Sequence, residues 1–299
     1  MPNLKDIRVR IASVKNTRKI TKAMKMVASA KLRRAQERMQ SSRPYAVKMG
    51  QVIASLASRV EEGTHPLLDP REERSSILVV VITSNRGLCG GFNTNLLREV
   101  DRFLDDREVA GEQIHIVTVG RKAHDHFKRS RHEVVANRSE LIGDVTFKKA
   151  QKVARGFIND FMEKQYDAVF LCFNKFVSAI ASDRIIAPVL PLSMDHEDFG
   201  GDDDDDAITV TGSGEFIYEP DVETLLGRLL PSHVELQFMQ ALYESEASEH
   251  AARMTAMDNA TNNAGDMIDS LTLQYNRARQ AYITREIVEI VSGAESLKG

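Results

Sequence analysis

The C-terminal stretch from Pro231 to Ser292 carries a stripe of apolar or small residues whose spacing alternates between four and three positions. The members of this stripe are Tyr243, Ala247, His250, Met254, Met257, Thr261, Ala264, Ile268, Leu271, Tyr275, Ala278 and Tyr282. A 3.5-residue repeat held for about five heptads is typical of a coiled-coil seam. At 1.5 Å per residue the stretch would form a helix roughly 90 Å long. We expect a helix of that length to need a partner helix along it.

A second helical stripe lies in residues 3–59, where apolar positions again recur every three or four residues. They include Leu4, Ile7, Ile11, Val14, Thr21, Met24, Ala28, Leu32, Ala35 and Met39. Pro44 should bend this helix rather than end it, because the apolar period resumes at Tyr45. Each helix alone would expose its stripe, so we expect the two to pair in antiparallel. The small residues expected to face one another are Ala23, Ala28, Ser29 and Ala30 on one helix and Ala252, Ala256, Ala260 and Ala264 on the other.

Between the two helices the period changes to strands that alternate with shorter helices. The unbroken apolar run Ile77–Ile82 predicts a strand that is covered on both faces. Further strands are expected over 113–119, 132–136, 168–173 and 185–192, and helices over 92–107, 121–128 and 145–164. This alternation favours a parallel α/β sheet. A hairpin of residues 208–210 and 215–218 would close the sheet, and a short helix after Asp221 would end at Pro231.

The predicted architecture is therefore an α/β domain inserted between the two halves of a long antiparallel coiled coil. We divide the chain into an N-terminal coiled-coil helix (1–60), the α/β domain (75–219) and a C-terminal coiled-coil helix (220–299). The α/β domain includes an acidic loop at 195–206, with five consecutive aspartates at 202–206. Like charges this dense stay solvated, and the spacing of an EF-type calcium loop is absent.

Charge is distributed unevenly along the chain. Residues 1–59 carry 15 Lys or Arg against Asp6 and Glu37, or +13, so the rest carries −16 of the total of −3. Nucleic acid is disfavoured as a ligand, because no aromatic residue lies among the basic ones before Tyr45 and the acidic remainder would repel a polyanion. Partner proteins with acidic loops fit the basic helix better.

Neither the cysteines nor the termini indicate secretion or a membrane span. Cys89 and Cys172 form no CxxC pair and no metal spacing, so we expect a reducing compartment. The N-terminus has no signal-peptide or transit pattern, and no apolar run approaches 18 residues. These features predict a chain made in a cytoplasm without an import step.

The segment Ser84–Asn93 follows a strand and precedes a helix, which is where phosphate-binding loops lie. It lacks both GxGxxG and a Gly-Lys-Ser/Thr sequence, so its glycines are better explained by a tight turn. No local pattern supports Cys89 as a nucleophile. The histidines at 124, 126 and 132 lack the spacing of metal ligands, so we expect them to be surface residues.

Several segments resemble the gamma subunit of the F-type ATP synthase. They are Ile20–Val27, Arg86–Asn93, Ala251–Met257, Tyr275–Ala281 and Ile283–Ala294, in the same order and at the same spacing as in that family. The resemblance covers the whole chain. It identifies the α/β domain as Rossmann-like and the coiled coil as a rotary shaft.

The resemblance implies a non-catalytic subunit, present once per complex, that couples proton flow through a membrane ring to ATP synthesis or hydrolysis. The shaft would turn inside a hexamer of alpha and beta subunits, and the α/β domain would lie against the epsilon subunit and the ring of c subunits. Nucleotide would bind to the hexamer, so this chain would need no cofactor, metal or nucleic acid. The expected location is the cytoplasmic side of a bacterial membrane, as a peripheral subunit.

Residue roles follow from the same resemblance. Contacts with beta-subunit loops are expected from Met24, Lys25, Arg253, Gln280, Thr284, Glu286 and Glu289, and an apolar bearing at the tip from Ile283, Ile287, Ile290 and Val291. Independently of the resemblance, the spacing of the two stripes predicts a coiled-coil seam that includes Ile7, Ile11, Val14, Met254, Met257, Ile268, Leu271 and Tyr275. Lys22, Lys25 and Arg253 would carry the electrostatic part of the contact. Two alternatives remain: an α/β enzyme with a coiled-coil arm, and a coiled-coil scaffold that binds nucleic acid.

Overall fold

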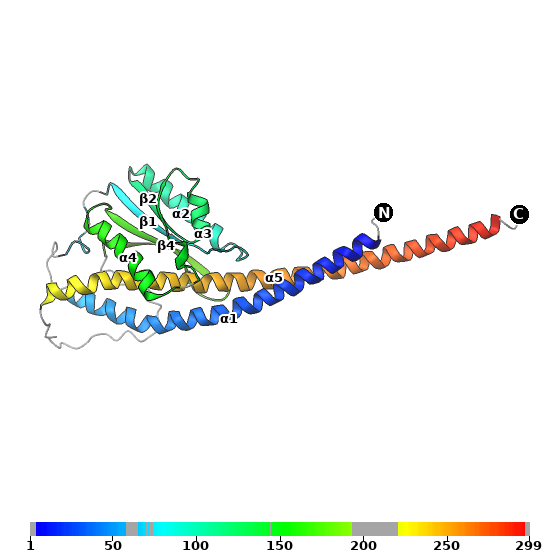
Figure 1. The fold of residues 1–299 in the computed structure, drawn as a ribbon, viewed down its shortest axis with the longest axis horizontal. Helices are drawn as coiled ribbons and strands as arrows, with labels where there is room; N and C mark the ends of the chain where they lie inside the picture. The colour runs from blue at the N-terminus through cyan, green and yellow to red at the C-terminus, as the bar shows by residue number, and fades with distance from the viewer. Residues whose placement is uncertain are drawn as a thin grey trace. The chain divides into compact units, whose positions relative to one another are not determined.

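The computed structural model describes residues 4–57, 65–69, 71, 74–143, 145–192 and 221–296. Its elements are α1 (Leu4–Ala57), β1 (Ser76–Ile82), α2 (Phe92–Val109), β2 (Gln113–Val119), α3 (Arg121–Phe127), β3 (Glu133–Asn137), the 3-10 turn η1 (Ser139–Leu141), α4 (Phe147–Met162), β4 (Ala168–Phe176), β5 (Ser182–Leu190) and α5 (Val222–Ser296). Two long helices thus enclose an α/β region in the sequence (Figure 1). The expected hairpin of 208–210 and 215–218 and the acidic loop 195–206 lie outside the described residues.

The chain divides into two compact units. We call Met1–Ser29 with Arg253–Gly299 the helix-pair unit, and Ala30–Ala252 the α/β unit. Both α1 and α5 contribute residues to each unit.

The sheet of the α/β unit has the strand order β3-β2-β1-β4-β5. Strands β1 to β4 pair in parallel, whereas β5 pairs with β4 in antiparallel. The expected parallel pairing therefore holds for β1 to β4, and the edge segment expected over 185–192 forms β5, which runs antiparallel. The reason is the short turn at 177–181, where the Ser178 amide donates to the Ala181 carbonyl at 2.9 Å. A parallel neighbour would need a crossover of a dozen or more residues.

Apolar side chains cover both faces of this sheet. On one face, residues of α2 and α3 such as Leu96, Val100 and Phe127 pack against β1 and β2. On the other face, α4 shares a core with parts of α1 and α5, including Ile53 and Phe238. Every residue from Ile77 to Ile82 is buried, as expected for a central strand with helices on both sides.

The half-buried carboxylate of Asp167 joins the end of α4 to the start of β1. The Arg71 guanidinium donates to Asp167 Oδ1 at 2.7 Å and to the Phe161 carbonyl at 2.6 Å. Asp167 Oδ2 accepts from the amides of Ser75 and Ser76, each at 2.9 Å. Desolvation alone would raise the pKa of Asp167, but the hydrogen bonds from Arg71, Ser75 and Ser76 outweigh it and lower the pKa to about 2.

Helix α5 passes through Pro231 without a break, so the expected separation of a short helix at this residue is wrong. Proline removes one backbone donor and crowds the carbonyl four residues earlier, which is that of the exposed Gly227. On the inner side, Leu226, Leu230 and Val234 are fully buried and hold the helix across the proline. Tertiary packing therefore outweighs the local cost of proline.

The N-terminus of α5 is capped by the side chain of Asp221. Asp221 Oδ1 accepts from the amide of Thr224 at 2.8 Å, and Asp221 Oδ2 accepts from the Thr224 hydroxyl at 2.8 Å. These bonds, led by the amide of Thr224, lower the pKa of Asp221. The charge also suits the positive end of the helix dipole.

Candidate functional site

In the helix-pair unit, α1 and α5 lie side by side in opposite directions (Figure 1). The Arg8 guanidinium donates to the Tyr275 hydroxyl at 3.0 Å. Further along, the Thr261 hydroxyl donates to the Thr21 hydroxyl at 2.8 Å, and Lys25 Nζ lies 2.7 Å from Asp258 Oδ1. Residue numbers rise on α1 as they fall on α5, so the helices pair in antiparallel in a single register.

The seam residues lie on the facing sides of the two helices. Ile7, Met257 and Ile268 are buried, and Ile11, Val14, Met254, Leu271 and Tyr275 are half-buried. The α5 stripe predicted from the heptad spacing stays buried or half-buried as far as Ala278, whereas Tyr282 is exposed. Two helices thus share the apolar stripe up to that point, and of the described residues only those of α5 continue beyond it.

Small residues contribute less to the seam than expected. Ala28 and Ala264 are buried, but Ala23, Ser29 and Ala30 are exposed. The expectation that all four small residues of α1 face α5 is therefore wrong. Consecutive helical residues point in different directions, so a cluster of neighbours cannot share one face.

The residues expected to contact beta-subunit loops differ in their surroundings. Gln280, Thr284, Glu286 and Glu289 are exposed on α5. Met24 and Arg253 are half-buried. Lys25 is half-buried as well, and its ammonium pairs with Asp258 of its own chain. Sequence reasoning missed Asp258; an antiparallel register would have placed its negative charge opposite Lys25.

The tip of α5 is an exposed helix rich in branched apolar residues. Its expected bearing residues are exposed by 45% at Ile283, 55% at Ile287, 67% at Ile290 and 57% at Val291. In soluble proteins a run of exposed aliphatic side chains of this kind marks an interaction surface. Figure 1 shows this red end of α5 continuing past the start of α1.

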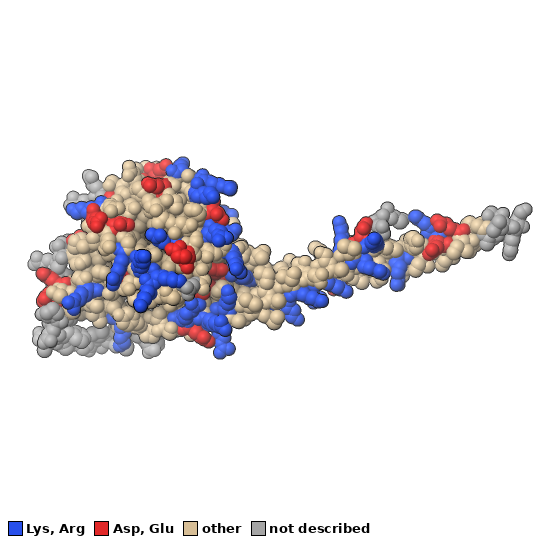
Figure 2. All heavy atoms as spheres, viewed as in Figure 1, with Lys and Arg blue, Asp and Glu red and all other residues tan. Residues whose placement is uncertain are grey.

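The outer face of the helix pair is basic along α1. Lys15, Lys19 and Lys22 are exposed, as is Arg18, whose guanidinium lies beside Gly265 of α5. Figure 2 shows Lys and Arg side chains projecting from this helix pair. Such a surface attracts acidic partners, with a strength that falls as salt increases.

The loop Ser84–Asn93 uses its polar groups internally. Asn93 Oδ1 accepts from the Ser84 amide at 3.0 Å, and Asn93 Nδ2 donates to the Ser84 hydroxyl at 2.8 Å and to Cys89 Sγ at 3.2 Å. Cys89 is buried, and Leu88 has a φ of 63° with its side chain 66% exposed. Groups already paired in this way are poorly placed to hold a phosphate.

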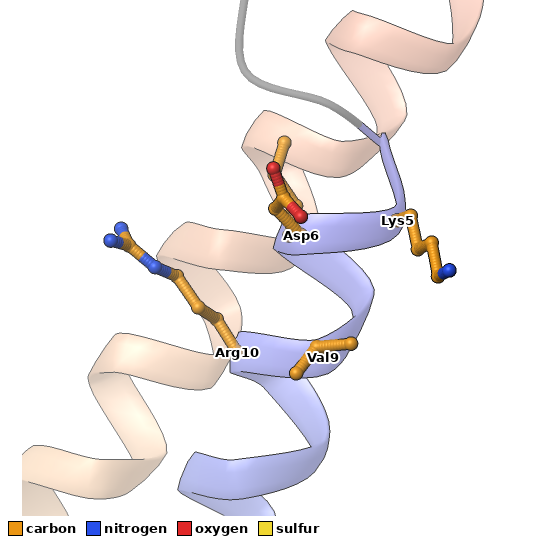
Figure 3. A pocket seen from close by; sticks show the side chains of 5 residues that line it. Lys5, Asp6, Val9 and Arg10 are labelled. Carbon is orange, nitrogen blue, oxygen red and sulfur yellow. The ribbon is translucent and has the colours of Figure 1, made fainter.

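Further features of the described residues are a surface depression, the absence of a cluster of metal-binding side chains and a buried thiol. A shallow depression is lined by Lys5, Asp6, Ile7, Val9 and Arg10, all from the first turns of α1. Figure 3 shows the Lys5 and Arg10 side chains pointing away from one another, so they do not converge on a ligand. Over the described ranges, no group of three or more metal-binding side chains gathers at one point, and no helix is long and apolar enough to span a membrane. Cys172 is buried, and this burial raises the pKa of its thiol.

Comparison with known proteins gives one consistent family. The family described as ATP synthase matches residues 3–297. The ATP synthase gamma chain of Trichlorobacter lovleyi is 47% identical, and that of Anaeromyxobacter sp. strain K is 49% identical, each over 100% of both chains.

Solved structures agree with this result. A chain from the central stalk and c-ring of the Tetrahymena thermophila mitochondrial ATP synthase has a TM-score of 0.58 and 27% identity, covering 81% of this chain and 99% of that one. A chain of the Euglena gracilis mitochondrial ATP synthase has a TM-score of 0.66 over 98% of this chain and 94% of that one, and at 23% identity it shows the fold alone. On the full-length match to these relatives, the chain belongs to the gamma chain family of the ATP synthase.

Proposed function

We propose that this chain is the central-stalk rotor subunit of an F-type ATP synthase, coupling proton flow through a membrane ring to ATP synthesis or hydrolysis in an alpha/beta hexamer. The observation that carries the proposal is the helix pair: two antiparallel helices share a seam, and, within the part of the chain that the structure describes, α5 continues alone as an exposed apolar tip. The similarity to ATP synthase gamma chains and to a chain of a central stalk supports a role for such a shaft in that complex.

The shaft would act through its shape. Two helices side by side are not symmetric about their common axis, so rotation brings different side chains to each of three equivalent sites. A rotor can bias a site only if it contacts two states of that site differently. The exposed polar residues of α5, Gln280, Thr284, Glu286 and Glu289, are available for such contacts, as is the apolar tip for a bearing.

The basic surface would supply the electrostatic part of the contact with acidic beta-subunit loops. Lys22 is exposed and fits this role directly. Lys25 shares its charge with Asp258, so its contribution to a partner would be smaller than that of Lys22. Met24 and Arg253 lie on the half-buried flank of the same helix pair.

We propose further that the subunit is not itself catalytic and binds no nucleotide, because its strand–helix loop is closed by its own hydrogen bonds. The α/β unit would then bind the epsilon subunit and the c-ring. One copy per complex, peripheral on the cytoplasmic side of a bacterial membrane, follows from the same assignment.

The test is reconstitution with the alpha and beta subunits. The full chain should co-purify with the hexamer and raise its steady-state ATP hydrolysis, and a chain that ends after Ala278 should do so less well. A hexamer that neither binds the chain nor changes its activity contradicts the proposal. Nucleotide binding by the chain alone would favour an α/β enzyme, and salt-dependent affinity for DNA or RNA would favour a nucleic-acid-binding scaffold.

A further inference from the structure

Strand β4 extends beyond the strand that pairs with it. The ladder between β1 and β4 ends at the pair Val81 and Cys172, whereas β4 continues to Phe176. Residues 173–176 therefore have β5 on one side and no β1 residue on the other. Backbone groups on that open edge need another partner, because unpaired buried polar groups are costly.

Two side chains of α5 take the place of the missing strand. The Ser248 hydroxyl donates to the Asn174 carbonyl at 3.0 Å, and Glu244 Oε2 accepts from the Phe176 amide at 2.8 Å. Residues two apart on a strand direct their backbone groups to the same edge, so both bonds lie on the same side of β4. All four residues belong to the α/β unit.

The spacings of helix and strand match at this point. Four residues of α-helix rise about 6.0 Å, and two residues of β-strand rise about 6.6 Å. Residues 244 and 248 of α5 can therefore meet residues 176 and 174 of β4 in one relative position. A shift of α5 along its axis by one residue would break both bonds. A rotation of α5 about that axis by one residue position would also break both.

The surroundings make the bond between Ser248 and Asn174 costly to lose, whereas Glu244 and Phe176 are half-buried. Ser248 is 1% exposed and Asn174 is 2% exposed, so no water can replace either partner. A third bond set lies nearer the start of α5, where the buried Glu235 accepts from Gln151 Nε2 and from Arg155 Nε of α4, each at 2.6 Å. An apolar core alone tolerates small slippage, whereas directional bonds to backbone atoms specify one register.

We propose that Glu244 and Ser248 are positioning residues that lock α5 to β4 in one axial and rotational register, so that torque passes between α5 and the sheet of the α/β unit without slippage. The inference rests on the rotor function proposed above. It assigns to two side chains a mechanical task separate from any contact with the hexamer. Glu244 would contribute more to this lock than Ser248, because the acceptor in its hydrogen bond is a charged carboxylate.

The experiment uses the complete complex in vesicles, with three variants of the chain: Glu244→Ala, Ser248→Ala and Glu244→Gln. The matched control is Glu223→Ala, which removes an exposed glutamate from the first turn of the same helix. Hydrogen exchange of residues 174–176, ATP hydrolysis and ATP-driven proton pumping are measured on the same preparations.

Glu244→Ala, which removes the acceptor of the Phe176 amide, should speed exchange of that amide by about tenfold, the equivalent of one lost hydrogen bond. Ser248→Ala should speed it less, because the Ser248 hydroxyl donates to the Asn174 carbonyl and not to an amide. ATP hydrolysis should persist while protons pumped per ATP fall. Glu244→Gln should restore both readouts, because an amide oxygen can accept the same bond, and Glu223→Ala should match the original chain.

Unchanged exchange at 174–176 overturns the proposed lock. Faster exchange with unchanged proton pumping per ATP overturns the role of the lock in transmitting torque. Failure of all three variants, including Glu244→Gln, to assemble into the complex also overturns that role. If the unmodified chain neither assembles nor supports pumping, the rotor function itself is wrong, and this outcome is distinct from the other three.

Discussion

The Lys25 ammonium lies 2.7 Å from a carboxylate oxygen of Asp258, across the seam between α1 and α5. The Lys25 and Asp258 side chains are 41% and 44% exposed, so water screens the pair and its contribution to stability is small. The pair nevertheless fixes the direction of the Lys25 side chain within its own chain. A residue expected to serve a partner subunit is therefore partly engaged before any partner binds.

A double-mutant cycle of Lys25→Ala and Asp258→Ala should give a coupling free energy of about 0.5 kcal/mol at low salt, as for other half-exposed pairs. The coupling should shrink in about 1 M salt, where the screening length is only a few ångströms. Urea unfolding followed by circular dichroism measures both. A coupling of zero at low salt would mean that the ammonium does not pair with Asp258 in solution.

Gly265→Ala should stabilise the helix pair by about 0.5–1 kcal/mol, because glycine is a poor helix former. A Cβ atom at this position would meet the Arg18 guanidinium at an ordinary distance of 3.8 Å. Gly156→Ala on α4, where the new atom meets nothing within 4 Å, measures the gain from helix propensity alone. A loss of thermal stability in Gly265→Ala with a gain in Gly156→Ala would show that Arg18 cannot accommodate the methyl group.

Gly120→Ala should destabilise the α/β unit severely, by about 3 kcal/mol or more. The residue has a φ of 109°, and a Cβ atom would lie 2.1 Å from the Thr83 carbonyl oxygen. Gly111→Ala is the matched control, because its φ of 86° is also positive but its Cβ would meet nothing within 4 Å. Equal losses in the two variants, measured by chemical unfolding, would mean that backbone strain and not the close approach determines the cost.

Asp167→Asn should remove about 2 kcal/mol of stability at neutral pH, the free-energy equivalent of lowering a carboxyl pKa from 3.8 to about 2. A carboxyl whose pKa is depressed by folding stabilises the folded state above its unfolded pKa. That contribution disappears as the pH falls through 3.8 toward 2, so the original chain and the variant should converge there. Unfolding curves between pH 7 and pH 2 test this, with the exposed Asp125→Asn as a control. A difference that stays constant with pH would contradict it.

Ile287→Ser combined with Ile290→Ser should change the free energy of unfolding by less than about 0.5 kcal/mol, because both side chains are exposed. The same double variant should reduce ATP hydrolysis by the assembled complex if the tip serves as a bearing. Ile268→Ser, buried in the seam, should instead cost about 3 kcal/mol of stability. Normal hydrolysis with the altered tip would contradict the bearing role.

The periodicity of apolar residues in the sequence predicted nearly every helix and strand, because each long apolar stripe could be buried only by packing against another element. It failed where tertiary packing outweighed a local rule. Pro231 does not end a helix whose neighbours Leu226 and Val234 are buried, and β5 reverses direction after a turn that the sequence does not mark with glycine or proline. Neither outcome depends on neighbours in the sequence alone.

The residues of the candidate site were predicted mainly from the resemblance to a known family. Heptad spacing indicates which residues of α5 face a partner helix, but it cannot say which exposed residues meet another protein. The pairing of Lys25 with Asp258 required the register between two helices more than 200 positions apart. The bonds of Glu244 and Ser248 to β4 required the length by which one strand overhangs another, which no periodicity encodes.

Beyond Ala278, α5 has no second helix of its own chain beside it over the described residues. Most helical stability in proteins comes from tertiary packing, and every residue from Gln280 to Gly293 is exposed at this end of α5. In the free chain this end should exchange rapidly between helix and coil. Whatever sleeve receives it must therefore supply the free energy of completing the helix, which makes ordering of the last turns a step in assembly of the complex.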